Sequence, residues 1–297
     1  MKPADRLAAA TDPADPANEA VPPHYRGVWR RTLLETPDAS DTGTTVFWLQ
    51  ASRWHADIRL PDGRPDFTGI DAFDKCGPAH IAWLARQQGF AGVTSVSVDG
   101  AGKEICQWRR IVDFQPPPAT PDAGSMDFDG DALTETGIHA RYLEEWRRLP
   151  DSIHGHAVLR LHEPQGGRSD ATRLLLMAGQ QVMHVRSRAA AWPAGLAPGV
   201  SLASLITPAT TDLLDFEISF GRLGPSGWTV VRSTLPWLEN TEVIVQVRPL
   251  GDSRIEIDFD GDMRCWDILE WSLPRLKGDW TGVIHSSYTN PKLSNAW

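Results

Sequence analysis

Apolar and polar residues alternate with a period of two along most of the chain after His24. Each run is six to eleven residues long, is rich in Val, Ile, Thr and Trp, and is bounded by Gly, Pro or Asp. This pattern is typical of half-buried β-strands. The predicted strands cover residues 45–51, 54–60, 92–98, 104–114, 156–163, 172–178, 180–187, 213–220, 227–234, 242–248 and 254–259. We therefore expect an all-β protein.

Helical patterns are few. Residues 81–89 (IAWLARQQG) predict a helix that a glycine ends, and residues 201–206 predict a shorter one. The segment 138–149 suits either structure, because Tyr142 and Trp146 share one face of a strand while its Leu, Glu and Arg residues also favour a helix. We interpret this segment as a strand.

A repeat divides the chain into two lobes. The string Asp-Phe-Asp-Gly-Asp occurs at residues 127–131 and again at 258–262, and three other short matches recur in the same order at similar offsets. Residues 1–23 lack periodicity and are rich in Ala, Pro and Asp, so we expect a disordered leader. The lobes would then be 24–150 and 151–297, and eight to ten short antiparallel strands in each fit a closed barrel without exposed edges.

The two Asp-rich strings also invite a calcium interpretation, which their spacing does not support. The sixth position is Ala132 or Met263 where a calcium loop needs Gly, and the twelfth is Ile138 or Leu269 where it needs Glu. Asp-Gly between alternating runs is instead a strong hairpin signal, because Gly accepts the positive φ of a primed turn. We predict a hairpin at each string.

A set of longer phrases resembles one family. The first lobe opens with Gly27-Val28-Trp29, which is similar to the lipocalin pattern in which a Trp near the first strand closes one end of the barrel. The phrases that carry the resemblance are GVWRRTLLET, TTVFWLQASRWHADIRLP, QQGFAG, EISFGR and GWTVVRSTLPW. Together they resemble the HRI1 family, a poorly characterised group with two lipocalin-like barrels. The resemblance implies a tandem-barrel fold over most of residues 24–280 and transfers no catalytic residue.

Composition excludes several classes of function. The chain of 297 residues has a net charge of −9 and no Lys/Arg cluster, which argues against nucleic-acid binding. No apolar run approaches the roughly 20 residues of a membrane span, and the N-terminus lacks a secretory apolar region. Three cysteines favour a reducing compartment, so we expect a cytoplasmic protein. The sequence does not indicate the oligomeric state.

Known catalytic and cofactor motifs are missing from the sequence. It has no phosphate-binding loop, dinucleotide fingerprint, CxxC pair or G-x-S-x-G elbow, so we expect no cofactor. His154 and His156 lie on one strand face and could share a metal ion, but further protein ligands would have to come from distant segments. We interpret them as solvent-facing strand histidines and predict no metal site.

Polar side chains on the strands of the first lobe are the better candidates. Asp57 and Arg59 share one face of a strand, as do Trp48 and Gln50 on the strand before it. If that face points into a barrel, buried charges must pair or bind a polar ligand, because a lone buried charge costs several kcal/mol. If it points outward, the alternating residues of 47–60 fill the barrel interior.

Two classes of function follow from these alternatives. In the first, a barrel binds a small, partly apolar or aromatic molecule, and cofactor-independent acid–base catalysis of the isomerase, hydratase or lyase type is possible. The predicted catalytic residues are Asp57 or Glu145 as base, with Arg59 and Arg110 stabilising negative charge, and the predicted ligand-binding residues are Trp48, Gln50, Trp108 and Tyr142. In the second class, the barrels are filled and the protein is a non-catalytic interaction or scaffold protein.

Overall fold

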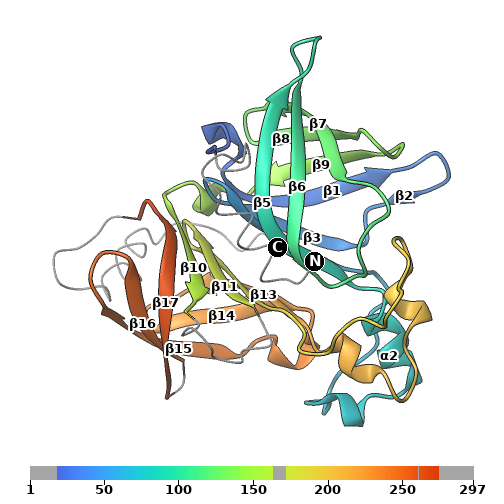
Figure 1. The fold of residues 1–297 in the computed structure, drawn as a ribbon, viewed down its shortest axis with the longest axis vertical. Helices are drawn as coiled ribbons and strands as arrows, with labels where there is room; N and C mark the ends of the chain where they lie inside the picture. The colour runs from blue at the N-terminus through green and yellow to red at the C-terminus, as the bar shows by residue number, and fades with distance from the viewer. Residues whose placement is uncertain (1–18, 163–171, 260, 274–297) are drawn as a thin grey trace.

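Two closed antiparallel β-barrels follow one another along the chain, as the sequence predicts. The computed structural model describes residues 19–162, 172–259 and 261–273. Figure 1 shows the first barrel above the second. Strands β3 (Thr45–Gln50) and β4 (Trp54–Leu60) of the first barrel contact the second. Among the described residues, no helix is long and apolar enough to cross a membrane.

The first barrel closes by pairing its first strand with its last. The register joins Trp29 to Arg148 and Glu35 to Leu143, and a short strand β2 pairs with the far end of β1. The strands are β1 (Gly27–Glu35), β2 (Ser40–Asp41), β3 (Thr45–Gln50), β4 (Trp54–Leu60), β5 (Gln88–Val98), β6 (Glu104–Asp113), β7 (Asp122–Asp129), β8 (Ala132–Gly137) and β9 (Leu143–Arg148). The segment 138–149 therefore contains a strand, as predicted.

The second barrel repeats the same topology with eight strands. They are β10 (His156–Leu161), β11 (Arg173–Ala178), β12 (Gln181–Arg186), β13 (Glu217–Leu223), β14 (Gly227–Ser233), β15 (Glu242–Pro249), β16 (Arg254–Phe259) and β17 (Asp262–Trp271). The two predicted hairpins are present: the turns contain Gly130 at φ 59° and Gly261 at φ 93°, a backbone conformation that glycine adopts without strain.

Helical structure is short and lies at the edges of the barrels. The α-helix of the described residues, α2 (Pro78–Leu84), begins three residues before the predicted segment and ends before Gly89, which belongs to β5. Pro78 is well placed to begin a helix, because its fixed φ suits the first turn, where its missing N–H costs nothing. The 3-10 helices in the described part of the chain are η2 (Pro23–Tyr25), η3 (Phe73–Lys75), η4 (Pro150–Ser152), η5 (Leu202–Ser204), η6 (Thr211–Leu214) and η7 (Pro236–Leu238).

One end of the first barrel is closed by the segment before β1. Val21 and Tyr25 are buried, and the Trp29 indole N–H donates to the Tyr25 carbonyl oxygen at 2.7 Å. The Val21 N–H also donates to the Ser52 carbonyl oxygen at 2.7 Å. The ordered chain thus begins before His24, which corrects the expected end of the leader; residues 1–18 lie outside the described residues.

The outer face of β3 and β4 packs against the second barrel rather than filling the first. Phe47 and Ile58 belong to an apolar cluster that also contains Ile218 and Phe220 of β13. The rings of Phe47 and Phe220 stack with centroids 4.3 Å apart. Because this face of the strands is buried between the barrels, the opposite face of β3 and β4 points into the first barrel.

A carboxylate of the second barrel holds a hairpin of the first. Glu270 accepts hydrogen bonds from the backbone N–H groups of Ser52, Arg53 and Trp54 at 2.7, 2.8 and 3.2 Å. Its side chain is 5% exposed. These three amides would otherwise have no protein acceptor at a partly buried turn, so the contact helps to fix the barrels in one relative position.

The two histidines considered as metal ligands lie in different environments. His154 is exposed, whereas His156 is buried, with its Nδ1 atom 2.9 Å from the Ser272 hydroxyl and its Nε2 atom 3.4 Å from a Glu270 oxygen. Burial lowers the pKa of His156 to about 4. The expectation of a solvent-facing residue is therefore wrong for His156.

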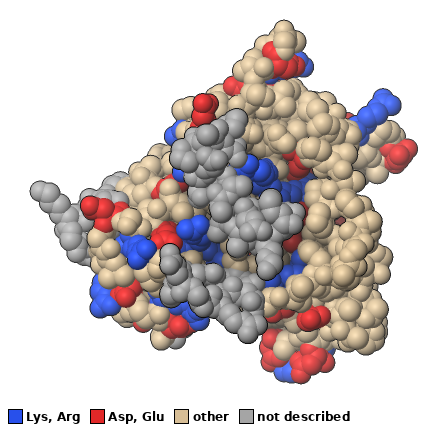
Figure 2. Space-filling view, viewed as in Figure 1, with Lys and Arg blue, Asp and Glu red and all other residues tan. Residues whose placement is uncertain are grey.

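The barrels differ in how they are filled. The interior of the second is packed with apolar side chains such as Leu159, Ile257 and Trp266, and its cavity is about 40 Å³. The first barrel encloses a cavity of about 350 Å³. A third hollow, a groove of about 1530 Å³, is lined by residues of both barrels. Figure 2 shows Lys and Arg side chains on the face of the molecule where the two barrels meet.

Candidate functional site

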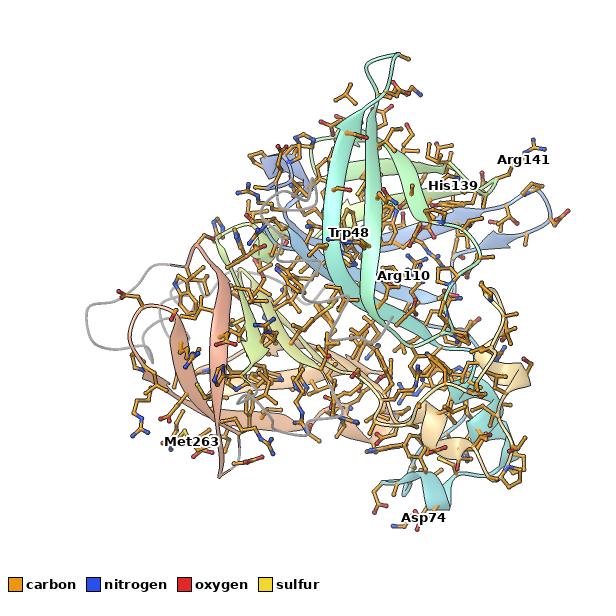
Figure 3. The ribbon with its side chains drawn as sticks, in the orientation of Figure 1. Trp48, Asp74, Arg110, His139, Arg141 and Met263 are labelled. Carbon is orange, nitrogen blue, oxygen red and sulfur yellow. The ribbon has the colours of Figure 1, made fainter. Side chains whose placement is uncertain are left out.

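The cavity of the first barrel collects side chains from all eight of its barrel strands. Its volume of about 350 Å³ falls within the range of small-molecule sites. The lining residues used below are Arg31, Trp48, Asp57, Arg59, Phe90, Trp108, Arg110, Asp122, Glu135, Tyr142, Glu144 and Trp146. Figure 3 shows Trp48 and Arg110 inside the barrel, with His139 and Arg141 beyond its strands.

Aromatic rings form one part of the wall. Trp48 meets Trp108 and Trp146 edge to face, with ring centroids 5.5 and 6.0 Å apart. Trp48 and Trp146 are each only 2% exposed, and their indole N–H groups have no acceptor among the described residues. A buried N–H without an acceptor is costly, so these two donors favour a bound molecule or water that carries hydrogen-bond acceptors.

A chain of ion pairs forms a second part of the wall. Arg31 contacts Glu144 and Asp41, both at 2.7 Å. Arg59 contacts Asp57 at 2.8 Å and reaches Glu144 at 3.5 Å. Burial raises the pKa of Asp57, and Arg59 opposes this effect. Each of these charges has an opposite charge beside it, as buried charges require.

A β-bulge sets the position of Arg110. The register of β5 and β6 shifts between Ala91 and Gly92, where a Cβ on residue 92 would lie 2.0 Å from the Arg109 carbonyl oxygen. The extra residue brings Arg110 and Asp113 to the same side of the strand, although their numbers differ in parity. Arg110 then contacts Asp113 at 2.9 Å and Asp122 at 2.6 Å, and its guanidinium lies 3.7 Å from the centroid of the Phe90 ring.

Glu135 is the carboxyl group of the cavity that has no basic partner among the described residues. It is 3% exposed and accepts a hydrogen bond from the Tyr142 hydroxyl at 2.6 Å. Burial, with the nearby charge of Glu144, raises its pKa to about 8. At neutral pH the group is therefore largely protonated and able to donate a proton, which is the property of a general acid.

The structure brings six of the eight predicted site residues to the cavity wall: Trp48, Asp57, Arg59, Trp108, Arg110 and Tyr142. Gln50 lies outside the wall, fully buried, where it accepts a hydrogen bond from the Thr94 hydroxyl at 2.8 Å. Glu145 is exposed on the outer face of β9, so its expected place in the site is wrong.

Six of the wall residues named above were not predicted as site residues: Arg31, Phe90, Asp122, Glu135, Glu144 and Trp146. Glu144 has the same parity as Tyr142 and Trp146, so the alternation of β9 already placed it, rather than Glu145, beside them. Glu135 lies in the short, polar segment Ala132–Gly137, whose few apolar residues give no strand signal. Within the described residues, no group of three His, Cys, Asp or Glu side chains could hold a metal ion.

Fold and cavity together define a tandem β-barrel protein with one polar, aromatic-lined chamber. Among solved structures, the chain is similar to that of the uncharacterized protein YLR301w of Saccharomyces cerevisiae. The TM-score is 0.52 and the sequence identity is 11%, and the match covers 83% of this chain and 98% of that one. This similarity supports the two-barrel architecture. No family model and no curated protein matches the sequence.

Proposed function

We propose that the first barrel binds a small, partly aromatic organic molecule that carries hydrogen-bond acceptors. The observation that supports this proposal most is a cavity of about 350 Å³ in which two buried indole N–H groups, of Trp48 and Trp146, have no acceptor among the described residues. A filled core would not leave such donors beside open space. The surrounding rings offer flat faces, and the paired charges offer polar groups at fixed positions.

The test is native mass spectrometry of the freshly purified full chain, with the denatured mass recorded beside it. We expect an excess mass of a few hundred daltons that is lost on denaturation. Leu34→Trp, which adds volume at the cavity wall, should abolish the excess, whereas Val98→Trp, at a position 65% exposed outside the cavity, should retain it. An empty wild-type chain, or equal occupancy in both variants, would favour the scaffold interpretation instead.

Glu135 supports a second, catalytic element of the proposal. Acid–base chemistry was expected at Asp57 or Glu145. Glu145 is exposed outside the cavity, and Arg59 contacts both oxygens of the Asp57 carboxylate, at 2.8 and 3.3 Å. Glu135 faces the cavity with the Tyr142 hydroxyl as its partner, so we assign proton transfer to it. In this assignment the protonated carboxyl donates to the bound molecule and recovers a proton as the product forms.

The catalytic element makes its own prediction. The Glu135→Gln variant should still bind the molecule but leave it unconverted, because the amide cannot transfer a proton. The molecules released from the wild-type chain and from the variant are compared by mass and chromatography, and we expect different species. Identical species from both proteins would show that Glu135 takes no part in a reaction.

We further infer that the chain is a remote member of the HRI1 family and a cytoplasmic protein. The phrases that resemble this family and the shared two-barrel architecture support the first inference. Cys76, Cys106 and Cys265 are free, which suits a reducing compartment and supports the second.

A further inference from the structure

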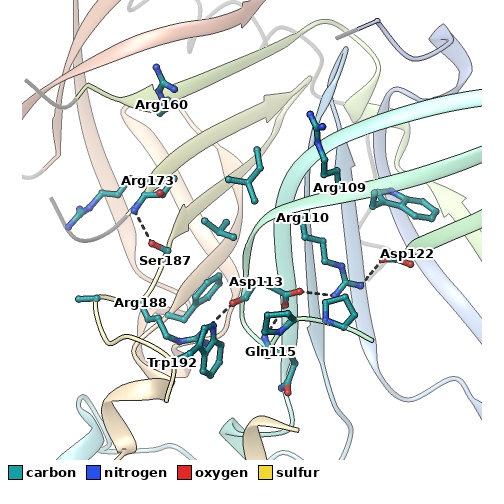
Figure 4. A pocket seen from close by; sticks show the side chains of 18 of the residues that line it. Arg109, Arg110, Asp113, Gln115, Asp122, Arg160, Arg173, Ser187, Arg188 and Trp192 are labelled. Atoms are coloured by element: carbon teal, nitrogen blue, oxygen red, sulfur yellow. Dashed lines mark hydrogen bonds and ion pairs between the residues drawn. The ribbon is translucent and has the colours of Figure 1, made fainter. Parts of the chain in front are cut away.

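The groove between the barrels concentrates positive charge on an acidic protein. Its described lining contains six arginines and His162 but only three aspartates, and it has no lysine or glutamate. The whole chain has a net charge of −9. In Figure 4, Arg160 and Arg173 of the second barrel face Arg109 and Arg110 of the first across the groove. A cleft lined by one sign of charge between low-dielectric walls attracts ions of the other sign.

One carboxylate contacts three basic side chains on the second-barrel side of the groove. Asp267 of β17 is the register partner of Arg160 on β10 and of Arg254 on β16, so the three side chains stand side by side. Nitrogen atoms of Arg160 and Arg254 lie 3.4 and 3.0 Å from oxygen atoms of Asp267, and the His162 Nδ1 atom lies 3.0 Å from the same carboxylate. Since a guanidinium has five N–H donors, both arginines keep donors that Asp267 does not use.

The other aspartates of the groove do not balance this excess. Asp113 and Asp122 both contact Arg110 on the first-barrel side. Arg188 donates to backbone carbonyl oxygens, and no carboxylate pairs with it among the described residues. Burial and the neighbouring arginines Arg264 and Arg186 lower the pKa of Arg173.

We propose that this groove binds a small polyanion, a molecule with two or more phosphate or carboxylate groups, through Arg160 and Arg254. Guanidinium groups bind both kinds of oxyanion with paired, charge-assisted hydrogen bonds. The rest of the chain is acidic, which favours a compact ligand. A small anion inside the groove lies close to the arginines, and acidic groups more than about 8 Å away are screened in physiological salt. A long polyanion would extend out of the groove and be repelled by the acidic surface. Trp108, Arg110 and Asp122 line both the groove and the barrel cavity, but Arg160 and Arg254, which carry this proposal, line the groove alone.

The test is isothermal titration of the full chain with inorganic tripolyphosphate and, separately, with citrate. We expect at least one of them to bind, and the double variant Arg160→Gln/Arg254→Gln to weaken that binding by at least about tenfold. Asp267→Asn should tighten the binding several-fold, since it removes the carboxylate that competes for both arginines. Arg248→Gln is the matched control: its side chain pairs with Glu256 outside the groove lining, so the affinity should not change.

Three results would overturn the proposal: no heat of binding for either anion at millimolar concentration, equal affinity in the wild-type chain and the double variant, or weaker binding in a folded Asp267→Asn variant. Preference for a single-stranded oligonucleotide over tripolyphosphate through the same arginines would replace the small ligand by a nucleic acid. The ratio of the two affinities assigns the site to phosphate or to carboxylate. Binding in the Leu34→Trp variant should equal wild type, which keeps this test independent of the barrel cavity.

Discussion

Replacing Arg188 with methionine should lower the free energy of unfolding by about 3 kcal/mol, because two buried carbonyl oxygens and one partly buried carbonyl oxygen lose their donor. Arg188 is 8% exposed and donates to the carbonyl oxygens of Asp113 and Phe114 in the first barrel and of Leu213 in the second. Its guanidinium also lies 4.0 Å from the centroid of the Trp192 ring. Methionine keeps the apolar stem of the side chain and removes every one of these hydrogen bonds.

The Arg188 side chain makes no ion pair with a described carboxylate, so its charge is stabilised by carbonyl dipoles. Burial lowers its pKa to about 10, although the charge of Asp113 opposes this effect. The group therefore remains charged at neutral pH, and its three bonds are charge-assisted. Because these bonds cross from one barrel to the other, the loss should also weaken the coupling between the barrels.

Urea denaturation followed by tryptophan fluorescence and by circular dichroism measures both effects. We expect a lower midpoint in Arg188→Met and a separation of the two signals as the barrels unfold in turn. The midpoint of Arg188→Lys should lie between those of the wild-type chain and Arg188→Met, because lysine can donate to fewer of the carbonyl oxygens. Arg248→Met is the control, since an exposed ion pair contributes about 1 kcal/mol or less. Equal losses in Arg188→Met and Arg248→Met would contradict the role assigned to Arg188.

Replacing Glu135 with glutamine should stabilise the protein at alkaline pH and leave its stability almost unchanged near pH 4.5. In the folded chain burial raises the pKa of Glu135 to about 8, against an ordinary value of 4.5. Folding therefore takes up a proton between these two values, so the contribution of this group to stability falls as the pH rises through that window. Glutamine resembles the protonated acid and has no proton to lose.

The size of this effect follows from the difference in pKa. Each unit corresponds to about 1.4 kcal/mol, which gives Glu135→Gln an advantage of up to about 5 kcal/mol above pH 8. The measurement is the difference in unfolding free energy between variant and wild type at intervals from pH 4.5 to 9. Glu145→Gln, on the exposed outer face of β9, should follow the wild-type curve. A Glu135→Gln difference that does not grow with pH would show that the carboxyl is already ionised in the folded chain.

Strand positions could be predicted from the sequence because alternation and turn residues are local signals. The segments 54–60 and 254–259 match β4 and β16 residue for residue. The strand Ala132–Gly137 was missed because an inward position is occupied by the polar Glu135, which lines a polar chamber, so apolar and polar residues do not alternate clearly. Helix α2 was predicted to begin too late in the sequence. The apolar spacing suggested a start at residue 81, whereas the helix begins at Pro78.

The direction of each strand face could not be predicted in the same way. Residues Val46 to Gln50 of β3 are all buried, one face in the barrel and the other against the second barrel. The positions of apolar side chains such as Phe47 and Ile58 therefore do not show which strand face points into the barrel. Whether the charged face is inside or outside depends on packing against the second barrel, which is distant in the sequence. The inward position of Asp57 and Arg59 follows only once both barrels are in place.

The contact of Glu270 with the hairpin amides of Ser52, Arg53 and Trp54 bears on whether the chain can be divided into two separate proteins. The hairpin of the first barrel takes its acceptor from the second barrel, and the buried Glu270 carboxylate has these three donors only when the first barrel is present. Either half expressed alone would therefore keep one partner of this contact and lose the other. We expect both separate halves to be less stable than the same barrels within the whole chain.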